Sequence, residues 1–465
     1  MPVTQKPEDF YCPPEDACTP IIALDKKEFD GWSKNADKTD AAQAGSQGFT
    51  GAEGDLAYIT GPNGDLTAVL FGLGAVDRAA KLGGLAAKLP EGNYEFEGTL
   101  SQDETAQAAL YWATGQYRFG RYLKKPGKAP RRLKLSSSLD GKRTHTLVQS
   151  IFLVRDLINT PPNDMGPDKL AAAAEIIAKE FSASLTVIVG DDLLKQNLPA
   201  IHAVGRAAEV APRLIDMTWG NASDPKVTLV GKGVTFDTGG LDLKSPAGML
   251  LMKKDMGGGA LVLGLARVIM AMALPIRLRV LIPAVENSVA ANAYRPSDII
   301  PTRKGISVEI GNTDAEGRVV LCDALALGDE EKPELMLDFA NLTGAAMVAL
   351  GSDLGALFAN DDKLAQGLLK GGEVTGDPLW RLPLWQPYRE ALKSEPADLN
   401  NMANTTYGGA ITAALYLEHF VETAKAWAHM DVYCWRTAAK PGRPKGAEAH
   451  SLLATFSYLE NRFGR

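Results

Sequence analysis

The feature that most constrains the fold is a series of short apolar segments that recur between residues 185 and 432. They lie at Leu185–Val189, Val227–Val230, Leu278–Ile282, Leu335–Phe339 and Trp427–Val432. Each has the length and apolar content of a buried strand, and the segments between them are long enough for crossover helices. The pattern therefore predicts an α/β fold with a mixed central β-sheet flanked by helices.

The first third of the chain also shows an α/β pattern. Short β-like runs at 68–72 and 94–96 alternate with alanine-rich amphipathic stretches at 75–89 and 103–114. Between Lys124 and Arg143 the composition shifts to Lys, Arg, Pro, Gly and Ser, which is typical of a solvated connector. We interpret this connector as the boundary between two domains.

The chain has 465 residues, which is more than one ordinary hydrophobic core accommodates. We expect a smaller N-terminal α/β domain over residues 1–143 and a larger C-terminal domain over residues 144–465 that contains the mixed sheet. An apolar, helical stretch from 147 to 158 opens the larger domain, and Pro161-Pro162 ends that stretch.

The composition disfavours several classes of protein. The four cysteines include no CxxC pair, so neither a disulfide scaffold nor a thiolate zinc site is expected. The first residues do not resemble a signal peptide, and the most apolar run, Ala260–Leu274, contains Arg267 and is too short to cross a bilayer. A net charge of −7 gives no general attraction to nucleic acid. We expect a soluble, cytoplasmic protein without membrane or nucleic-acid partners.

A glycine-rich segment follows the strand-like run at 227–230. It reads GKGVTFDTGG over Gly231–Gly240, and its glycines allow a ligand to approach the backbone closely. The GxxxxGK[ST] order of a phosphate-binding loop is absent, so we reject a nucleotide site. We expect a turn here, followed by a strand-like segment Leu241–Lys244 whose alternation places Asp242 and Lys244 on one face, toward a cleft.

A second polar motif, Lys253-Lys254-Asp255, precedes the apolar run Ala260–Leu274, which has the composition of a buried helix. For this motif alone, the more ordinary interpretation is structural. In that interpretation Asp255 caps the helix and the two lysines are surface charges.

A third motif, Asn312–Arg318 (NTDAEGR), stands between a strand-like run at 307–310 and a helical run. Thr313 and Glu316 fit a capping box, which explains the motif in structural terms. Capping does not explain Arg318, because a cation in the first turn opposes the helix dipole unless an anion binds beside it.

Taken together, the three motifs supply four carboxylates and three compensating cations. Carboxylates that converge in a partly desolvated cleft repel one another and take up protons, unless divalent cations hold them ionised. We therefore infer a site for two metal ions. None of the five histidines has HExxH spacing, so they are interpreted as structural. The carboxylates are Asp237, Asp255, Asp314 and Glu316, and the cations are Lys232, Lys244 and Arg318.

These motifs carry a resemblance to a known family. Val230–Ala260 and Asn312–Leu321 resemble the paired signature of the leucyl aminopeptidase family, and Arg155–Pro167 (RDLINTPPNDMGP) is similar as well. The similarity covers most of the chain after Val148, whereas the first 140 residues match only in general character.

The resemblance implies a catalytic C-terminal domain that holds two divalent ions, manganese or zinc, with magnesium or cobalt as alternatives. In this family pattern Asp237 and Glu316 bridge the two ions. Lys232 binds through a neutral amine, which requires a lowered pKa. The implied metal ligands are Lys232, Asp237, Asp255, Asp314 and Glu316.

The resemblance also implies an activity and its residues. The chain would hydrolyse the N-terminal residue from peptides, with a leucine-like preference, through a water bridging the two ions. Lys244 would polarise the scissile carbonyl, and Arg318 would hold a bicarbonate that serves as general base. The backbone of Leu342 and Gly344 would contact substrate, Met252 would line the first side-chain pocket, and the chain would form a homohexamer.

The sequence departs from the family pattern at Thr238, Val319 and Asn341, and its run Tyr433-Cys434-Trp435 is unusual. None of these departures removes an implied metal ligand. Two other functions stay open at this point. A two-metal phosphoesterase needs similar ligands, and a catalytically silent relative could act as a scaffold or bind DNA.

Overall fold

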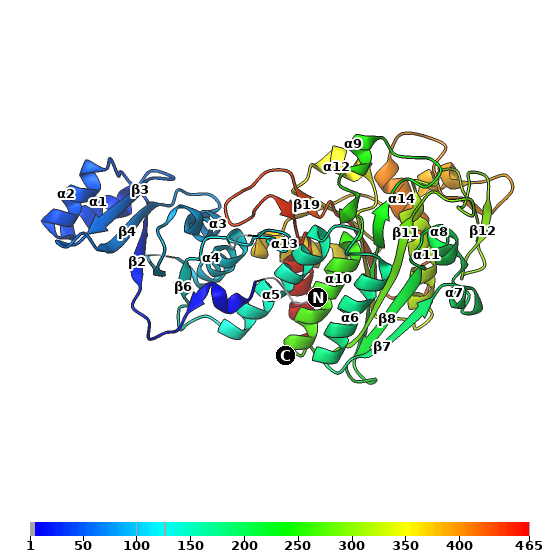
Figure 1. The fold of residues 1–465 in the computed structure, drawn as a ribbon, viewed down its shortest axis with the longest axis horizontal. Coiled ribbons are helices and arrows are strands. Elements are labelled where there is room, and N and C mark those ends of the chain that lie inside the picture. The colour runs from blue at the N-terminus through cyan, green and yellow to red at the C-terminus, as the bar shows by residue number, and fades with distance from the viewer. Residues whose placement is uncertain (1–4, 99, 125–126, 465) are drawn as a thin grey trace. The chain divides into compact units, whose positions relative to one another are not determined.

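A computed structural model describes residues 5–98, 100–124 and 127–464 of the chain. It shows two compact units (Figure 1). The N-terminal unit contains the chain up to Phe152 and the segment Thr437–Lys445, and the larger unit contains Leu153–Arg436 and the chain from Gly446 onward. Helix α5 (Gly141–Asn159) crosses the expected boundary at residues 143 and 144, and that boundary stays a prediction.

The N-terminal unit has, within the described ranges, a six-stranded sheet in the order β1-β6-β5-β2-β4-β3. Neighbouring strands are parallel except β3 and β4. The segment Thr437–Lys445 packs into this unit, where the Thr114 hydroxyl donates to the Gly442 carbonyl at 3.0 Å. The strands are β1 (Tyr11–Cys12), β2 (Thr19–Leu24), β3 (Leu56–Thr60), β4 (Leu66–Gly72), β5 (Asn93–Glu97) and β6 (Arg132–Lys134), and the α-helices are α1 (Lys26–Asn35), α2 (Lys38–Ser46), α3 (Arg78–Gly83) and α4 (Gln102–Gly115).

The larger unit is built on a nine-stranded sheet, counted over the described residues. Its order is β16-β15-β18-β14-β9-β11-β8-β7, and β10 pairs with β11 beyond the end of β9. Strands β15, β8 and β7 each run antiparallel to a neighbour, so the sheet is mixed as predicted. The strands are β7 (Ser184–Val189), β8 (Arg213–Trp219), β9 (Lys226–Gly231), β10 (Gly233–Asp237), β11 (Arg277–Asn287), β14 (Leu335–Ala340), β15 (Gly355–Ala359), β16 (Leu379–Arg381) and β18 (Trp427–Asp431).

Helices cover both faces of this sheet (Figure 1), which confirms the predicted architecture. Helix α10 packs with α6 and α15, and α11 packs with α8 and α14. Alternate residues of β11 face the two layers, because Ile282 lies against Gly259 in α10 and Leu281 lies against Gly328 in α11. In the described part of the chain, no helix is both long and apolar enough to span a bilayer. The helices are α6 (Pro167–Glu180), α8 (Pro199–Gly205), α10 (Gly257–Ala271), α11 (Glu316–Asp329), α14 (Gly409–Glu418) and α15 (Leu452–Phe463).

Strands β10, β11, β9, β14 and β18 run parallel to one another, so their carboxyl ends lie at the same edge of the sheet. Polar residues stand at each of these ends. Asp237, Asn287 and Asp431 are the last residues of β10, β11 and β18, and Lys232 and Asn341 directly follow β9 and β14. In α/β sheets this edge is where ligands bind.

The expected turn over 231–240 and the expected strand over 241–244 are wrong in detail. Residues Gly233–Asp237 form β10, and the chain turns only at Gly239 and Gly240, whose φ angles are 90° and 66°. The Lys244 amide then donates to the Thr238 carbonyl at 2.9 Å, which closes a tight loop. This loop, and not strand alternation, therefore sets the direction of the Lys244 side chain.

The expected helix caps are also wrong. The N-cap residues of α11 and α10 are Ala315 and Met256, and neither position has a side-chain cap hydrogen bond. The Thr313 hydroxyl instead donates to the Gly239 carbonyl at 2.6 Å. The Asp255 carboxylate likewise does not cap α10. The interpretation of both motifs as helix caps is therefore wrong, because their polar groups contact residues that are distant in sequence.

A buried polar network joins two neighbouring strands below this edge. Asp338 in β14 is fully buried and accepts hydrogen bonds from Trp427 Nε1 at 2.8 Å and His429 Nδ1 at 2.5 Å. Asp338→Ala leaves both donors buried without an acceptor, so we expect it to lower the free energy of unfolding by about 3 kcal/mol or more.

Urea unfolding followed by circular dichroism measures this loss. The matched control is Asp192→Ala, which removes an exposed carboxylate paired with Lys195 and should change the free energy of unfolding by less than about 0.5 kcal/mol. Equal stability of the two variants would contradict a structural role for the buried network.

Candidate active site

A pocket of about 440 Å³ is lined by residues from this edge of the larger unit. No histidine in the described ranges lines it. Of the site residues predicted from the sequence, Arg318 alone does not line the pocket. Those that do are Lys232, Asp237, Lys244, Met252, Asp255, Asp314, Glu316, Leu342 and Gly344.

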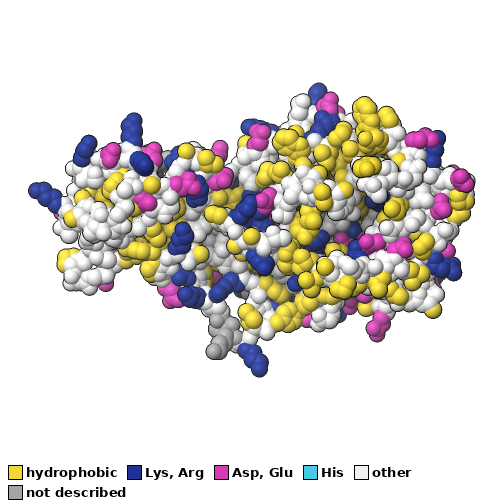
Figure 2. Space-filling view, turned by 90° about the horizontal axis from the view of Figure 1, so that it is seen from above, with side chains coloured by type: hydrophobic (Ala, Val, Ile, Leu, Met, Phe, Trp, Pro, Cys, Tyr) yellow, Lys and Arg dark blue, Asp and Glu magenta, His cyan; other side chains and the backbone are white. Residues whose placement is uncertain are grey.

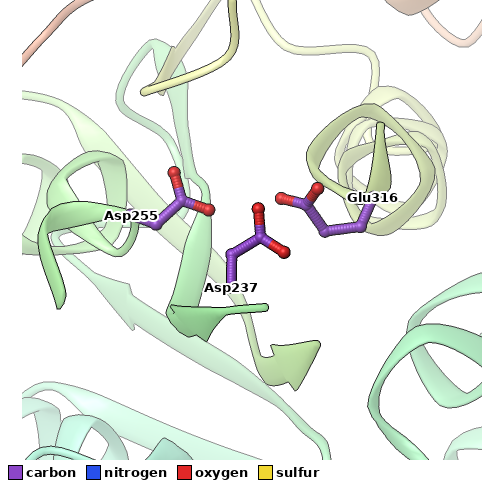
Figure 3. Close-up of side chains that lie close together, drawn as sticks. All are labelled: Asp237, Asp255 and Glu316. Atoms are coloured by element: carbon purple, nitrogen blue, oxygen red, sulfur yellow. The ribbon is translucent and has the colours of Figure 1, made fainter. Parts of the chain in front are cut away.

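Three buried carboxylates converge in this pocket. Asp237, Asp255 and Glu316 each offer an oxygen atom, and these oxygens lie within 4.8 Å of one another. Figure 3 shows the three side chains pointing toward a common centre from β10, from the turn before α10 and from the first residue of α11. The three residues are 1–3% exposed, so water screens the repulsion between their carboxylates poorly.

Lys232 lies at the centre of this cluster. Its Nζ is 2.8 Å from Asp255 Oδ2 and 2.7 Å from Glu316 Oε1, and it donates to the Asn341 carbonyl at 3.1 Å. Burial lowers the pKa of Lys232, but Asp255, Glu316 and Asp237 outweigh burial and hold the pKa above its ordinary value. A neutral amine at this position therefore needs further cations that compensate the carboxylates.

Lys244 joins the cluster to a fourth carboxylate. Its Nζ is 2.8 Å from Asp237 Oδ2 and also pairs closely with Asp314 Oδ1. Burial lowers the pKa of Lys244, and the two aspartates more than reverse this effect. The Asp314 carboxylate lies outside the convergent group of three, so Lys244 links the two halves of the site.

The charge balance of the pocket favours additional cations. Burial, followed by repulsion from Asp237, raises the pKa of Glu316 well above its ordinary value, although Lys232 lowers it. Burial also raises the pKa of Asp314 to about 6, although Lys244 lowers it. Apart from their ion pairs with Lys232 and Lys244, Asp255 Oδ2, Asp314 Oδ1 and Glu316 Oε1 are buried without a hydrogen bond. A set of hard oxygen donors in this arrangement fits divalent metal ions.

A buried network positions the ligand-bearing loops. Asn287 Nδ2 donates to Asp237 Oδ1 at 2.8 Å and to the Thr313 carbonyl at 3.0 Å. The Tyr294 hydroxyl donates to the same carbonyl at 2.5 Å, and the Thr313 amide donates to Asp242 Oδ2 at 2.8 Å. These bonds join the loop after β10 to the loop before α11, so the carboxylates of the two loops are held in one place.

Glycines let the backbone pack closely around the cluster. A Cβ atom on Gly258 would lie 2.0 Å from the Phe339 carbonyl oxygen, and one on Gly317 would lie 2.6 Å from Lys232 Cε. Both distances are shorter than any tolerated contact. The Gly257-Gly258-Gly259 run therefore allows α10 to start directly against the ends of β9 and β14.

The loop after β14 also lines the pocket. Asp431 Oδ1 accepts hydrogen bonds from the amides of Leu342 (2.9 Å) and Thr343 (3.3 Å), and Asp431 Oδ2 accepts one from the Thr343 hydroxyl at 2.6 Å. This loop leads into the short helix α12 (Gly344–Leu350). These bonds fix the Leu342 backbone in the pocket lining, next to Gly344.

Arg318 lies in the first turn of α11, outside the pocket lining. Its Nη1 donates to the Asn401 carbonyl at 2.8 Å, while its Nε is buried without a hydrogen bond. Burial lowers the pKa of this guanidinium, although Tyr416 and Glu316 raise it. The predicted conflict between this cation and the helix dipole is therefore present in the structure.

Some pocket residues were missed in the sequence analysis. Asp431 lines the pocket and ends β18, so applying the strand-end rule to every strand would have found it. Asn287 does not line the pocket but holds Asp237 from the end of β11, beyond the run predicted at 278–282.

Lys254 also lines the pocket, as does Tyr433, whose run the sequence had already marked as unusual. Lys254 was interpreted as a surface charge, and no local pattern distinguishes it from the neighbouring Lys253.

Comparisons with known proteins place the chain in one family. A family model described as the catalytic domain of the cytosol aminopeptidase family matches residues 152–454, and a model of the M17 aminopeptidase N-terminal domain matches residues 19–135. A probable cytosol aminopeptidase of Dechloromonas aromatica is 39% identical over 373 residues, covering 77% of this chain and 74% of the relative. One from Roseiflexus castenholzii is 42% identical over 364 residues and covers 74% of each chain.

Solved structures show the same fold. The crystal structure of a cytosol aminopeptidase from Coxiella burnetii has a TM-score of 0.94 and 47% identity, covering 98% of this chain and 100% of that one. The bottromycin maturation enzyme BotP in complex with Mn has a TM-score of 0.85 and 29% identity, covering 96% and 100%. The chain therefore belongs to the cytosol aminopeptidase family and is a metal-dependent leucyl aminopeptidase-type exopeptidase.

Proposed function

We propose that the pocket holds two divalent ions, with Lys232, Asp237, Asp255, Asp314 and Glu316 as their ligands. The observation that carries this proposal is the convergence of three buried carboxylate oxygens within 4.8 Å of one another. Asp237 and Glu316, the ligands that the two ions would share in the family pattern, both belong to that group, as does Asp255. Manganese is the ion we propose first, because the similar enzyme BotP was solved with Mn, and zinc, magnesium and cobalt also suit oxygen donors.

The chain's own residues supply the rest of the mechanism. Divalent ions at such a site acidify a water molecule and polarise a peptide carbonyl. Lys244 reaches into the pocket between Asp237 and Asp314, where its ammonium can donate to the carbonyl oxygen as negative charge develops. We propose that Arg318 holds a bicarbonate ion that acts as the general base. This role is supported by the Arg318 Nε atom, which is buried without a hydrogen-bond partner.

Substrate binding is proposed for residues of the pocket lining. The loop held by Asp431 presents the backbone of Leu342 and Gly344, and Met252 lines the same pocket. Peptides are the substrates, and the N-terminal side chain would lie against Met252.

We propose that the chain forms a homohexamer in the cytoplasm. Two observations support the proposed hexamer. The chain belongs to the cytosol aminopeptidase family, and large apolar side chains are exposed on its larger unit. Leu250, Val348 and Tyr407 are 78%, 86% and 83% exposed. Figure 2, seen from the side where α12 lies in Figure 1, shows hydrophobic side chains gathered over the larger unit. Patches of this kind favour self-association, and light scattering of the purified chain measures the oligomer.

The test of the proposed function is hydrolysis by metal-stripped protein that is titrated with manganese or zinc. We expect no activity without metal, and restored release from amino-acid p-nitroanilides and dipeptides that saturates near two ions per chain. N-acetylated substrates should stay intact, since an exopeptidase requires a free amino terminus. Cleavage of a phosphodiester would favour the phosphoesterase, and metal binding without any hydrolysis would favour a silent scaffold.

A further inference from the structure

Lys254 is a buried lysine whose side chain no step of the mechanism uses. It ends the short 3-10 helix Met252–Lys254, is 5% exposed, and lines the same pocket as Met252 and Leu342. A lysine that is this deeply buried normally has an anionic partner. The groups around Lys254 therefore indicate which kind of substrate the pocket can bind.

The Lys254 ammonium has no such partner. Within the described ranges it makes no ion pair and no side-chain hydrogen bond, and its Nζ lies over the ring of Tyr433, 4.5 Å from the centroid. Lys232 and Lys244, which line the same pocket, are each paired with two carboxylates. A cation–π contact satisfies an ammonium group only in part, because its three hydrogen-bond donors stay available.

The neighbouring carboxylates are already engaged. Asp431 also lines the pocket, but its two oxygens accept hydrogen bonds from Leu342 and Thr343. Asp255, next in sequence, pairs with Lys232. The free donors of Lys254 are therefore available to a ligand.

The pocket that Lys254 lines also has apolar surface that suits the stem of an acidic side chain. Leu251, Met252 and Met347 line the pocket with apolar surface that can pack against methylene groups. A carboxylate at the end of such a stem would form a charge-assisted hydrogen bond with the ammonium in a site of low dielectric. A leucine side chain would fill the same space and leave the buried ammonium unpaired, which costs affinity.

We propose that Lys254 makes this pocket selective for peptides whose N-terminal residue is glutamate or aspartate. This inference rests on the proposed function, because it assigns the substrate class of the same site. It replaces the leucine-like preference that the family resemblance implies with a preference for acidic residues.

The first test uses the unmodified, metal-loaded chain. Glutamyl and glutaminyl p-nitroanilides have nearly the same shape and differ in charge, so their kcat/KM ratio isolates the effect of the ammonium. We expect the glutamyl substrate to be favoured by about tenfold or more. Equal rates, or a faster glutaminyl substrate, would overturn the inference. Failure to cleave any substrate, leucyl included, would instead count against the proposed function.

The second test uses matched variants. Lys254→Met keeps the length of the side chain and removes its charge, so the glutamyl over glutaminyl ratio should fall about tenfold while hydrolysis of the leucyl substrate persists. Lys253→Met is the control, because Lys253 is outside the pocket lining, donates to the Asn159 carbonyl at 2.9 Å and lies over Trp435. The Lys253→Met variant should have the same glutamyl over glutaminyl ratio of kcat/KM as the unmodified chain.

Two further results decide the inference if Lys254→Met is unstable. Lys254→Arg keeps the charge and should keep the preference for glutamate. Free glutamate should inhibit leucyl p-nitroanilide hydrolysis by the unmodified chain more strongly than free glutamine does. A ratio that shifts equally in the Lys253 and Lys254 variants, or equal inhibition by the two amino acids, would refute a role for Lys254 in selectivity.

Discussion

Lys244→Ala is expected to lower kcat about a hundred- to a thousandfold while the metal content of the protein stays unchanged. Lys244 reaches the pocket from a loop and pairs there with Asp237 and Asp314. When metal ions compensate these carboxylates, the ammonium is free to stabilise the negative charge that develops on the substrate carbonyl. Removing a preorganised donor of this kind acts on the transition state far more than on substrate binding.

Steady-state kinetics together with elemental analysis of dialysed protein measure this effect. The matched control is Leu243→Ala, because Leu243 precedes Lys244 on the same loop, is 61% exposed and does not line the pocket. Its kcat should stay close to that of the unmodified chain. A rise in KM without a fall in kcat would show that Lys244 binds substrate instead of stabilising the transition state.

Asp255→Ala is expected to act on the metal itself. Asp255 is one of the three convergent carboxylates, and its side chain is almost fully buried. Losing a group that only orients a metal ligand costs about 10- to 100-fold in metal affinity, so losing a ligand should cost at least about 100-fold. Activity should fall in parallel and should recover in part when the metal concentration is raised.

Elemental analysis after dialysis, with activity measured against added manganese, checks this prediction. Asp192→Ala serves again as the control, since it removes an exposed carboxylate far in sequence from the pocket. Thermal melts in excess chelator separate metal loss from unfolding. If Lys244→Ala lost as much metal as Asp255→Ala, the division of roles between these residues would be wrong.

Metal binding should also change the protonation state of Lys232. The surrounding carboxylates hold the pKa of Lys232 above its ordinary value, whereas a metal-bound amine must be neutral. Metal binding should therefore release protons, and metal affinity should rise with pH.

Much of the site could be predicted because its residues follow strands. The apolar runs at 227–230, 335–339 and 427–432 are buried on both faces of the sheet, and such strands are recognisable from composition alone. Asp237 and Glu316 stand next to glycine-rich or polar motifs that interrupt this apolar pattern. Their residue types then point to metal binding through charge repulsion, without knowledge of any distance.

The local predictions that failed share one cause. Thr313 looks like a helix cap in the sequence, yet its hydroxyl bonds to Gly239, which lies 74 positions earlier in the chain. Leu241–Lys244 alternates like a strand, yet it lies in a loop whose Asp242 carboxylate accepts a hydrogen bond from the Thr313 amide, 71 positions later in the chain. In both places a contact between distant segments outweighed a weak local preference.

The sequence by itself determined the mixed sheet, the family and the residue types of the metal site, because these depend on hydrophobic periodicity and on motifs that are short in sequence. Only the tertiary structure decided where each cation lies. Lys253 and Lys254 are adjacent lysines, but the turn before α10 sends one to the Asn159 carbonyl and the other into the pocket over Tyr433. That difference depends on where Asn159 and Tyr433 lie, residues far from the two lysines along the chain, and no local pattern encodes it.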